Sequence, residues 1–177
     1  LVHGSNLLVS APNAQPVADR LRSLDLLVVC DFVPSETALL ADVVLPVTQW
    51  AEEEGTMTSL EGRVIRRRKA IDAPEGVRSE LWVWAQLASR LGAAGSWDTE
   101  PSLVFDELAR ASAGGRADYS GLSHARLDAV EEGFFWPCPT GSDGTPRMFT
   151  ERFAHPDGRA RMVATTPGAP ADDLQPD

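Results

Sequence analysis

Apolar and polar residues alternate in blocks over the first 47 positions, and these blocks predict strands and helices in turn. Apolar side chains three or four positions apart between 17 and 24 indicate a helix. The apolar run 26–30, between Asp25 and Asp31, is typical of a strand buried on both faces of a parallel sheet. The other expected elements are a strand end and a loop within residues 1–9, a short helix over 36–41 capped by Ser35, and a strand at 43–45.

The pattern weakens after residue 50. Residues 50–63 are mostly charged, polar or small, which predicts a long loop, and a short strand is expected at 64–65. Nearer the C-terminus we expect a short helix near 123–130 and extended segments at 147–149 and 160–163.

Two longer helices are predicted in the middle of the chain, where they would cover one side of the sheet. Ser79 is a good N-cap for a helix over 80–91, and Pro101 begins a second helix that runs to about 111. Helical spacing predicts that each buries one face: Leu81, Trp84, Ala85, Ala88 and Leu91 in the first, and Val104, Leu108 and Ala111 in the second.

The order of these elements predicts an α/β fold, with a parallel sheet flanked by helices and an irregular C-terminal extension. Parallel strands end at one edge of their sheet, and ligands of such folds bind there. We divide the chain into a layered part over 1–112, an irregular connecting segment with extended strands over 113–165, and a Pro, Ala and Asp tail over 166–177. The tail is expected to be flexible or a linker.

The net charge of −10 argues against a nucleic-acid or anionic-membrane surface, because both need clustered Lys and Arg. Acids flank the one basic run, residues 66–69, so we expect it to be a solvated face or to pack against an acidic neighbour. No apolar run is long enough for a membrane span, and no signal sequence opens the chain, so targeting is not readable. Because the chain begins at Leu1, we expect an upstream part.

The two cysteines, Cys30 and Cys138, lie far apart and in no metal-ligand spacing. This argues against a disulfide framework, a zinc site or an iron–sulfur cluster built within the chain. Cys30 closes an apolar strand, which predicts a buried thiol. His3, His124 and His155 also lack ligand spacing, and we assign them no chemical role.

Seven segments occur in an order that carries a resemblance: GSN, PNA, LVVCDFVPSETALLADVVLP, WAEEEGTMTSLEGRV, WPCP, GTPRMFT and HPDGRARM. Together they resemble the molybdopterin-dependent oxidoreductases of the dimethyl-sulfoxide-reductase superfamily. They look most like the catalytic subunits of assimilatory nitrate reductases, followed by those of formate dehydrogenases. The resemblance covers nearly all of residues 1–165.

The resemblance implies that residues 1–112 are the later part of a Rossmann-like domain, the third of four, which binds molybdopterin guanine dinucleotide. Two such dinucleotides would chelate molybdenum. An upstream domain would carry a 4Fe-4S cluster and the molybdenum ligand, and a β-barrel domain would follow the chain. Other implied features are a cytoplasmic enzyme, an electron-donor protein or domain, and no direct membrane contact. The fragment by itself would be inactive.

The resemblance also implies five cofactor-binding residues. Asp31 would accept the N1–H and N2–H donors of guanine, or would only begin a turn. Asn6 would contact the cofactor, or would form a local Asx turn. The others are Cys30, through its backbone, Glu53, and Glu80, which would otherwise complement the dipole of its helix.

Three positions depart from the family. Glu53 stands where some members have a Lys that contacts the dinucleotide, Leu7 replaces a usual Pro, and Ser59 replaces a frequent Asn. Glu36 and Thr37 are interpreted as the first turn of a helix, although the family keeps them near the ligand.

Arg63 is expected to pair with one of the acids at 52–54 and to hold the loop. Trp50, Trp82 and Trp136 are expected in the core or at a domain interface.

These features predict part of a nitrate reductase. The alternatives are a formate dehydrogenase, a non-catalytic scaffold like the large iron–sulfur subunit of respiratory complex I, and a free-standing nucleotide-binding module.

Overall fold

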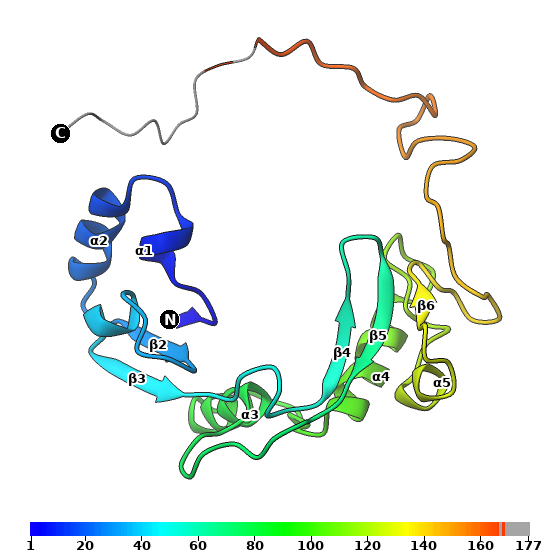
Figure 1. The fold of residues 1–177 in the computed structure, drawn as a ribbon. Helices are drawn as coiled ribbons and strands as arrows, with labels where there is room; N and C mark the ends of the chain where they lie inside the picture. Colours follow the sequence, from blue (N-terminus) through cyan, green and yellow to red (C-terminus); the bar gives the residue numbers. More distant parts are fainter. Residues whose placement is uncertain (167, 169–177) are drawn as a thin grey trace. The chain divides into compact units, whose positions relative to one another are not determined.

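The structure is a computed structural model that describes residues 1–166 and 168 (Figure 1). It forms two compact units. The first contains residues 1–47 and the segment from Phe149 onward, and the second contains residues 48–148. The predicted tail over 166–177 lies outside the described residues, apart from 166 and 168. None of the helices in the described residues is long and apolar enough to cross a membrane.

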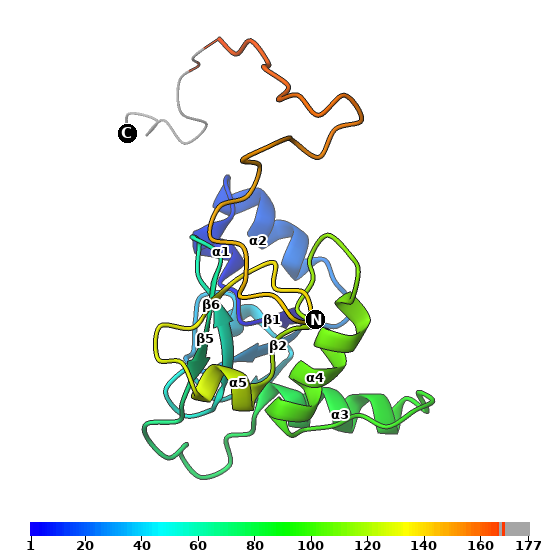
Figure 2. The same ribbon diagram turned by 90° about the vertical axis from the view of Figure 1, so that its right-hand side faces the viewer.

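The first unit is built on a three-stranded parallel sheet, as the apolar runs predicted. Its order is β1-β2-β3, and Val29 of the central strand pairs with Val2 on one side and Val44 on the other. The helices α1 and α2 lie on the same side of this sheet in both ribbon views (Figures 1 and 2). The elements are β1 (Val2–His3), α1 (Leu7–Ser10), α2 (Ala14–Arg22), β2 (Val28–Asp31), η1 (Ala38–Leu40) and β3 (Val43–Pro46).

The core of the first unit forms where the central strand meets the helices. Val29 is fully buried, and Leu21 of α2, Leu27 and Ala38 of η1 pack in the same cluster. The helix predicted over 36–41 is shorter than expected: it is the single 3₁₀ turn η1, to which Ser35 contributes by accepting a hydrogen bond from the Ala38 N–H at 3.3 Å.

The second unit contains an antiparallel sheet that the sequence did not predict. Its strands are β4 (Gly55–Thr58), β5 (Arg63–Arg67) and β6 (Phe134–Phe135), in that order. The long loop expected over 50–63 is therefore wrong, because half of a hairpin lies within it. The turn is closed by the Ser59 N–H, which donates to the Arg63 carbonyl at 2.8 Å, and by Gly62 at φ 87°.

Three helices complete the second unit: α3 (Glu80–Arg90), α4 (Pro101–Ser112) and α5 (His124–Asp128). The Ser79 side chain caps α3, accepting from the Trp82 N–H at 3.2 Å, and Pro101 begins α4, both as predicted. Phe105 of α4 packs with Val64 of β5, so this helix covers the antiparallel sheet.

The predicted buried face of α3 is confirmed in part, and that of α4 is largely wrong. In α3, Ala88 is buried and Leu81, Trp84 and Ala85 are half-buried, but Leu91 is exposed and Val83, which was not predicted, is buried. The buried residues of α4 are Phe105 and Ala109, neither of which was predicted. Helical spacing gives the width of an apolar face, but the direction in which the face points depends on the packing partner. Here that partner is a sheet whose existence the pattern did not reveal.

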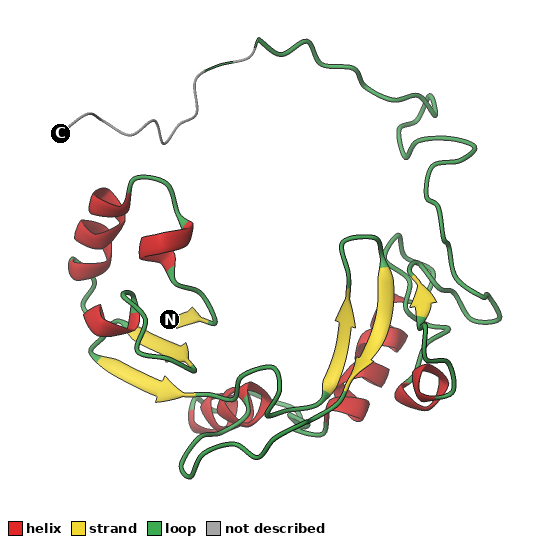
Figure 3. Cartoon of the chain, in the orientation of Figure 1, coloured by secondary structure: helices red, strands yellow, loops and turns green. Residues whose placement is uncertain are grey.

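The extended segments expected at 147–149 and 160–163 do not form strands. Figure 3 shows the described chain after Met148 as loop. Phe149 has a left-handed φ of 61°, which interrupts an extended backbone, and its ring stacks on Phe153 with centroids 5.4 Å apart.

Candidate functional site

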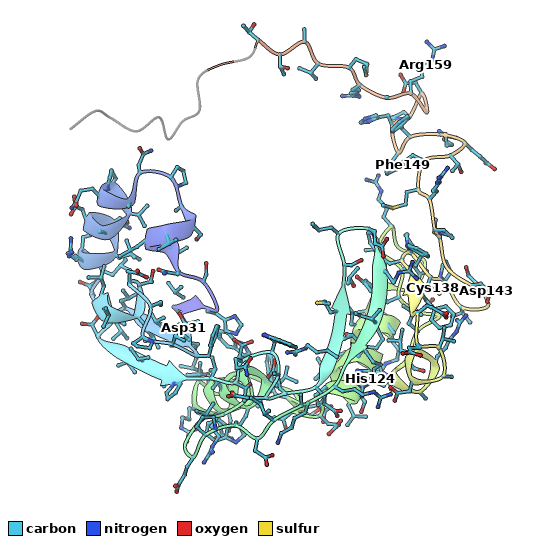
Figure 4. The ribbon with its side chains drawn as sticks, viewed as in Figure 1. Asp31, His124, Cys138, Asp143, Phe149 and Arg159 are labelled. Atoms are coloured by element: carbon cyan, nitrogen blue, oxygen red, sulfur yellow. The ribbon has the colours of Figure 1, made fainter. Side chains whose placement is uncertain are left out.

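The C-terminal ends of β1 and β2 lie at one edge of the parallel sheet, as the strand order requires. His3 pairs with Cys30 in the ladder, and the Gly4 N–H donates to the Cys30 carbonyl at 3.0 Å. This bond ties the loop after β1 to the end of β2. Asn6 follows β1 and Asp31 ends β2, so both lie near this edge of the first unit (Figure 4 labels Asp31).

Asp31 makes the turn that was its alternative interpretation. Its Oδ1 accepts from the Phe32 N–H at 2.8 Å, and its Oδ2 accepts from the Ser35 hydroxyl at 2.6 Å. The residue is only 6% exposed. A carboxylate has about four acceptor positions, so these two bonds leave acceptor capacity on both oxygens. A turn role and a ligand role are therefore compatible.

Asn6 does not form the local Asx turn that was its alternative interpretation. Its side-chain oxygen accepts from Thr37 twice, from the N–H at 3.3 Å and from the hydroxyl at 3.0 Å. Its Nδ2 donates to Glu36 Oε2 at 2.5 Å. Asn6 also precedes α1 without capping it through its side chain. The amide is held instead by residues about 30 positions away.

Glu36 belongs to this site, although its sequence interpretation as the first turn of a helix gave it another role. It precedes η1, which is one turn long, so a helix dipole is not what holds its charge. Hydrogen bonding to a backbone group and then to the Asn6 amide lowers the pKa of the exposed Glu36 carboxyl. The edge therefore carries two carboxylates, Asp31 and Glu36.

Cys30 contributes through its backbone and through packing. Its side chain is fully buried, as predicted, and its carbonyl accepts the hydrogen bond from Gly4. Leu7, which replaces the family's usual Pro, is the first residue of α1. That position also tolerates Pro, so either residue suits the same backbone.

Glu53 lies in the second unit and is held by protein groups. Its Oε1 pairs with Arg67 Nη2 at 2.8 Å, and its Oε2 accepts from the Thr48 hydroxyl at 2.6 Å. Glu80, the other predicted residue of this unit, is the first residue of α3 after the Ser79 cap.

The basic run 66–69 packs against acidic neighbours, one of the two arrangements predicted for it. Arg66 is shared between Glu54 at 3.2 Å and Asp128 at 3.0 Å. The remaining pairs of the run are Arg67 with Glu53, Arg68 with Asp128 and Lys69 with Asp72.

Arg63 has a structural role, as expected, but its predicted partner is wrong. It pairs with Glu61 at 2.8 Å rather than with an acid at 52–54, which Arg66 and Arg67 engage. It also donates to the Glu132 carbonyl at 3.0 Å and lies over the Phe135 ring. Arg63 thus joins β5 to the segment that carries β6.

Of the three tryptophans expected in the core or at a domain interface, one packs against a core. Trp136 packs against the core of the second unit, whereas Trp50 and Trp82 are 70% and 40% exposed and are not core residues of this chain. Ser59 accepts from the Arg63 N–H at 3.2 Å within the hairpin turn, which explains a short hydroxyl side chain there.

The parallel sheet and its helices place the first unit in the α/β class of folds, in which ligands bind at the C-terminal ends of the strands. Within that class, residues 1–90 match the model of the molybdopterin oxidoreductase family, and the chain belongs to this family.

Relatives with two different activities are similar to the chain. It is 46% identical over 160 residues to the assimilatory nitrate reductase catalytic subunit of Bacillus subtilis (strain 168), covering 89% of this chain and 22% of the relative. It is 41% identical over 162 residues to the F420-dependent formate dehydrogenase 2 subunit alpha of Methanococcus maripaludis, covering 90% and 23%. It is 40% identical over 174 residues to the assimilatory nitrate reductase of Haloferax mediterranei, covering 94% and 24%. The chain thus spans about a quarter of the length of these relatives.

Proposed function

We propose that this chain helps to bind a bis(molybdopterin guanine dinucleotide) cofactor in a molybdenum-dependent oxidoreductase that reduces nitrate to nitrite. The observation that carries the binding role is the C-terminal edge of the parallel sheet, where Glu36 holds the Asn6 amide and Asp31 ends β2. The family membership supports the pterin, and the 46% identity to an assimilatory nitrate reductase supports nitrate.

The chemistry of this edge fits the guanine end of the ligand. Guanine offers N1–H and N2–H as neighbouring donors, and the carboxylate of Asp31 is an acceptor. Glu36 is ionised at neutral pH and accepts one Nδ2 hydrogen of Asn6. Asn6 Nδ2 carries a second hydrogen, which Glu36 does not take, and this donor suits a phosphate or carbonyl oxygen.

Glu53 and Glu80 would contact the cofactor from the second unit. Glu80, at the start of α3, is retained as a cofactor contact of the second unit. Glu53 is retained only in a pair with Arg67, because the guanidinium then supplies the positive charge that a phosphate requires. Cys30 is retained as the backbone support of the edge.

The chemistry of the reaction would come from parts outside this chain. The bound molybdenum supplies oxygen-atom transfer, by which nitrate, two electrons and two protons give nitrite and water. The proposal includes an upstream 4Fe-4S cluster, an electron-donor protein or domain, a C-terminal domain that closes over the dinucleotides, and a cytoplasmic location. The residues of this chain would bind and orient the cofactor.

Formate oxidation is the second candidate. Two of the three relatives above are named nitrate reductases, but the third is named a formate dehydrogenase and is 41% identical to this chain. The test uses the full-length polypeptide that contains this chain, purified and assayed with viologen dyes. Nitrate-dependent oxidation of reduced viologen is expected, without formate-dependent reduction of the oxidised dye. The reverse pattern would replace nitrate by formate, and a protein without pterin would favour the scaffold.

A further inference from the structure

The hydrogen bonds around Asn6 fix which atom of its amide is the oxygen. The Thr37 N–H is only a donor, so the Asn6 atom that faces it must be the acceptor Oδ1. The Glu36 carboxylate, which is ionised at neutral pH, is only an acceptor, so the atom that faces it must be the donor Nδ2. A flipped amide would set like groups against each other at both ends.

The Thr37 hydroxyl is fixed by the same reasoning. The Leu8 N–H donates to Thr37 Oγ1 at 3.3 Å, so the single hydroxyl hydrogen is directed to Asn6 Oδ1 at 3.0 Å. Thr37 is fully buried, which removes water as a competing partner. Asn6 Oδ1 therefore accepts two hydrogen bonds, the usual capacity of a carbonyl oxygen.

These contacts leave Asn6 with one kind of ligand chemistry. Its oxygen is occupied by Thr37, and one Nδ2 hydrogen is taken by Glu36, so the remaining polar group is the second N–H. An amide in this state donates to a phosphate or carbonyl oxygen and does not accept from a ribose hydroxyl.

We propose that Glu36 and Thr37 are positioning residues that hold Asn6 as a donor toward an acceptor oxygen of the guanine dinucleotide. The inference rests on the proposed function, because Asn6 needs a bound dinucleotide to act on. It extends that function by giving a role to Glu36 and Thr37, which the sequence had suggested only as the first turn of a helix. It also excludes ribose recognition through the Asn6 oxygen.

The first test replaces Glu36 in the full-length protein and follows how fast the dinucleotide is lost during dialysis. The readout is GMP released by acid per polypeptide. Glu36→Ala should lose the dinucleotide roughly tenfold faster, the effect of one charge-assisted hydrogen bond. Glu36→Gln should stay within about twofold of the parent, because the Gln oxygen still accepts from Nδ2. Glu36 is exposed, so the thermal midpoint should not change in either variant.

The second test exchanges the polarity of the pair. Asn6→Asp sets two carboxylates against each other, so it should lower the thermal midpoint and accelerate loss of the dinucleotide. Combined Asn6→Asp and Glu36→Gln restores a donor–acceptor pair between the two side chains, so the thermal midpoint should recover. The loss rate should stay high, because residue 6 then presents only acceptors to the ligand.

Thr37 gives an independent variant in case those at Asn6 fold poorly. Thr37→Val removes the hydroxyl at nearly constant volume and should speed the loss roughly threefold to tenfold, while Thr37→Ser should match the parent.

The outcomes separate the two proposals. If the parent holds guanine dinucleotide and Glu36→Ala loses it at the parental rate, the positioning role is wrong and the proposed function stands. Recovery of slow loss in the double variant would likewise contradict a donor-only Asn6. If the purified parent releases no GMP, the proposed function fails and the positioning role fails with it.

Discussion

At the residue scale, the pair Glu53 and Arg67 explains how an acid is accommodated where some family members have Lys. The two side chains meet at 2.8 Å and are 24% and 21% exposed, so the pair is partly shielded from water. Thr48 satisfies the second oxygen of Glu53. The reversal of charge is thus balanced within the second unit and does not leave an uncompensated charge.

The variant Glu53→Lys tests this balance. It would set an ammonium against the Arg67 guanidinium and remove the acceptor of the Thr48 hydroxyl, at a cost of about 1 kcal/mol for a partly exposed pair. Hydrogen exchange over residues 55–67 should show roughly fivefold lower protection. Glu53→Gln is the matched control and should lose less, because it keeps an acceptor. Equal protection in Glu53→Lys and the parent would show that the pair does not hold the hairpin.

His124 predicts a pH dependence of the second unit. Burial first, and the charge of Arg66 second, lower its pKa from the ordinary 6.5, while Glu54, Asp128 and Asp106 act in the opposite direction. The ring packs on Phe105, and its Nε2 is buried without a hydrogen-bond partner among the described residues. The folded second unit therefore favours the neutral imidazole of His124. Protonation of the ring would lower the stability of this unit.

Because the pKa of His124 is lower in the folded state, the second unit is more stable at neutral pH than at acidic pH. The stabilisation is complete above pH 6.5 and is lost as the pH falls from there through the folded pKa of His124. Hydrogen exchange of α5, corrected for its intrinsic pH dependence, should show lower protection at pH 5 than at pH 7. His124→Phe should abolish that difference, and an unchanged difference in this variant would assign it to another group.

At the scale of elements, the sequence predicts the parallel sheet well because both of its longer strands are continuous apolar runs. It predicts the antiparallel sheet poorly because β4, Gly55–Thr58, has no alternating apolar face to recognise. The candidate site was likewise predictable only in part. Asp31 was found from its place at a strand end, but the bond between Asn6 and Glu36 joins residues 30 positions apart, which periodicity does not encode.

Gly133 is the residue that permits β6 to approach β5. It has a positive φ of 71°, and a Cβ added there would collide with the Val64 carbonyl. Gly133→Ala should destabilise the β5–β6 pairing by about 2 kcal/mol and lower hydrogen-exchange protection over residues 63–67. Gly76→Ala is a matched control, because Gly76 has φ 87° and no atom within 4 Å of its added Cβ. Protection that falls equally in both variants would contradict a specific contact.

At the scale of the whole molecule, the proposed function assigns cofactor binding to this chain and the reaction to other parts of a longer polypeptide. The described residues contain no group of three His, Cys, Asp or Glu side chains that could hold a metal ion. The chain spans about a quarter of the length of the relatives it matches.

The cofactor content of the full-length protein decides between this function and the scaffold. The purified protein is hydrolysed in acid, and GMP and molybdenum are quantified against polypeptide in the same sample. Two GMP for each molybdenum, near one molybdenum per polypeptide, is the predicted result. Protein that is folded but contains neither molybdenum nor GMP would contradict it.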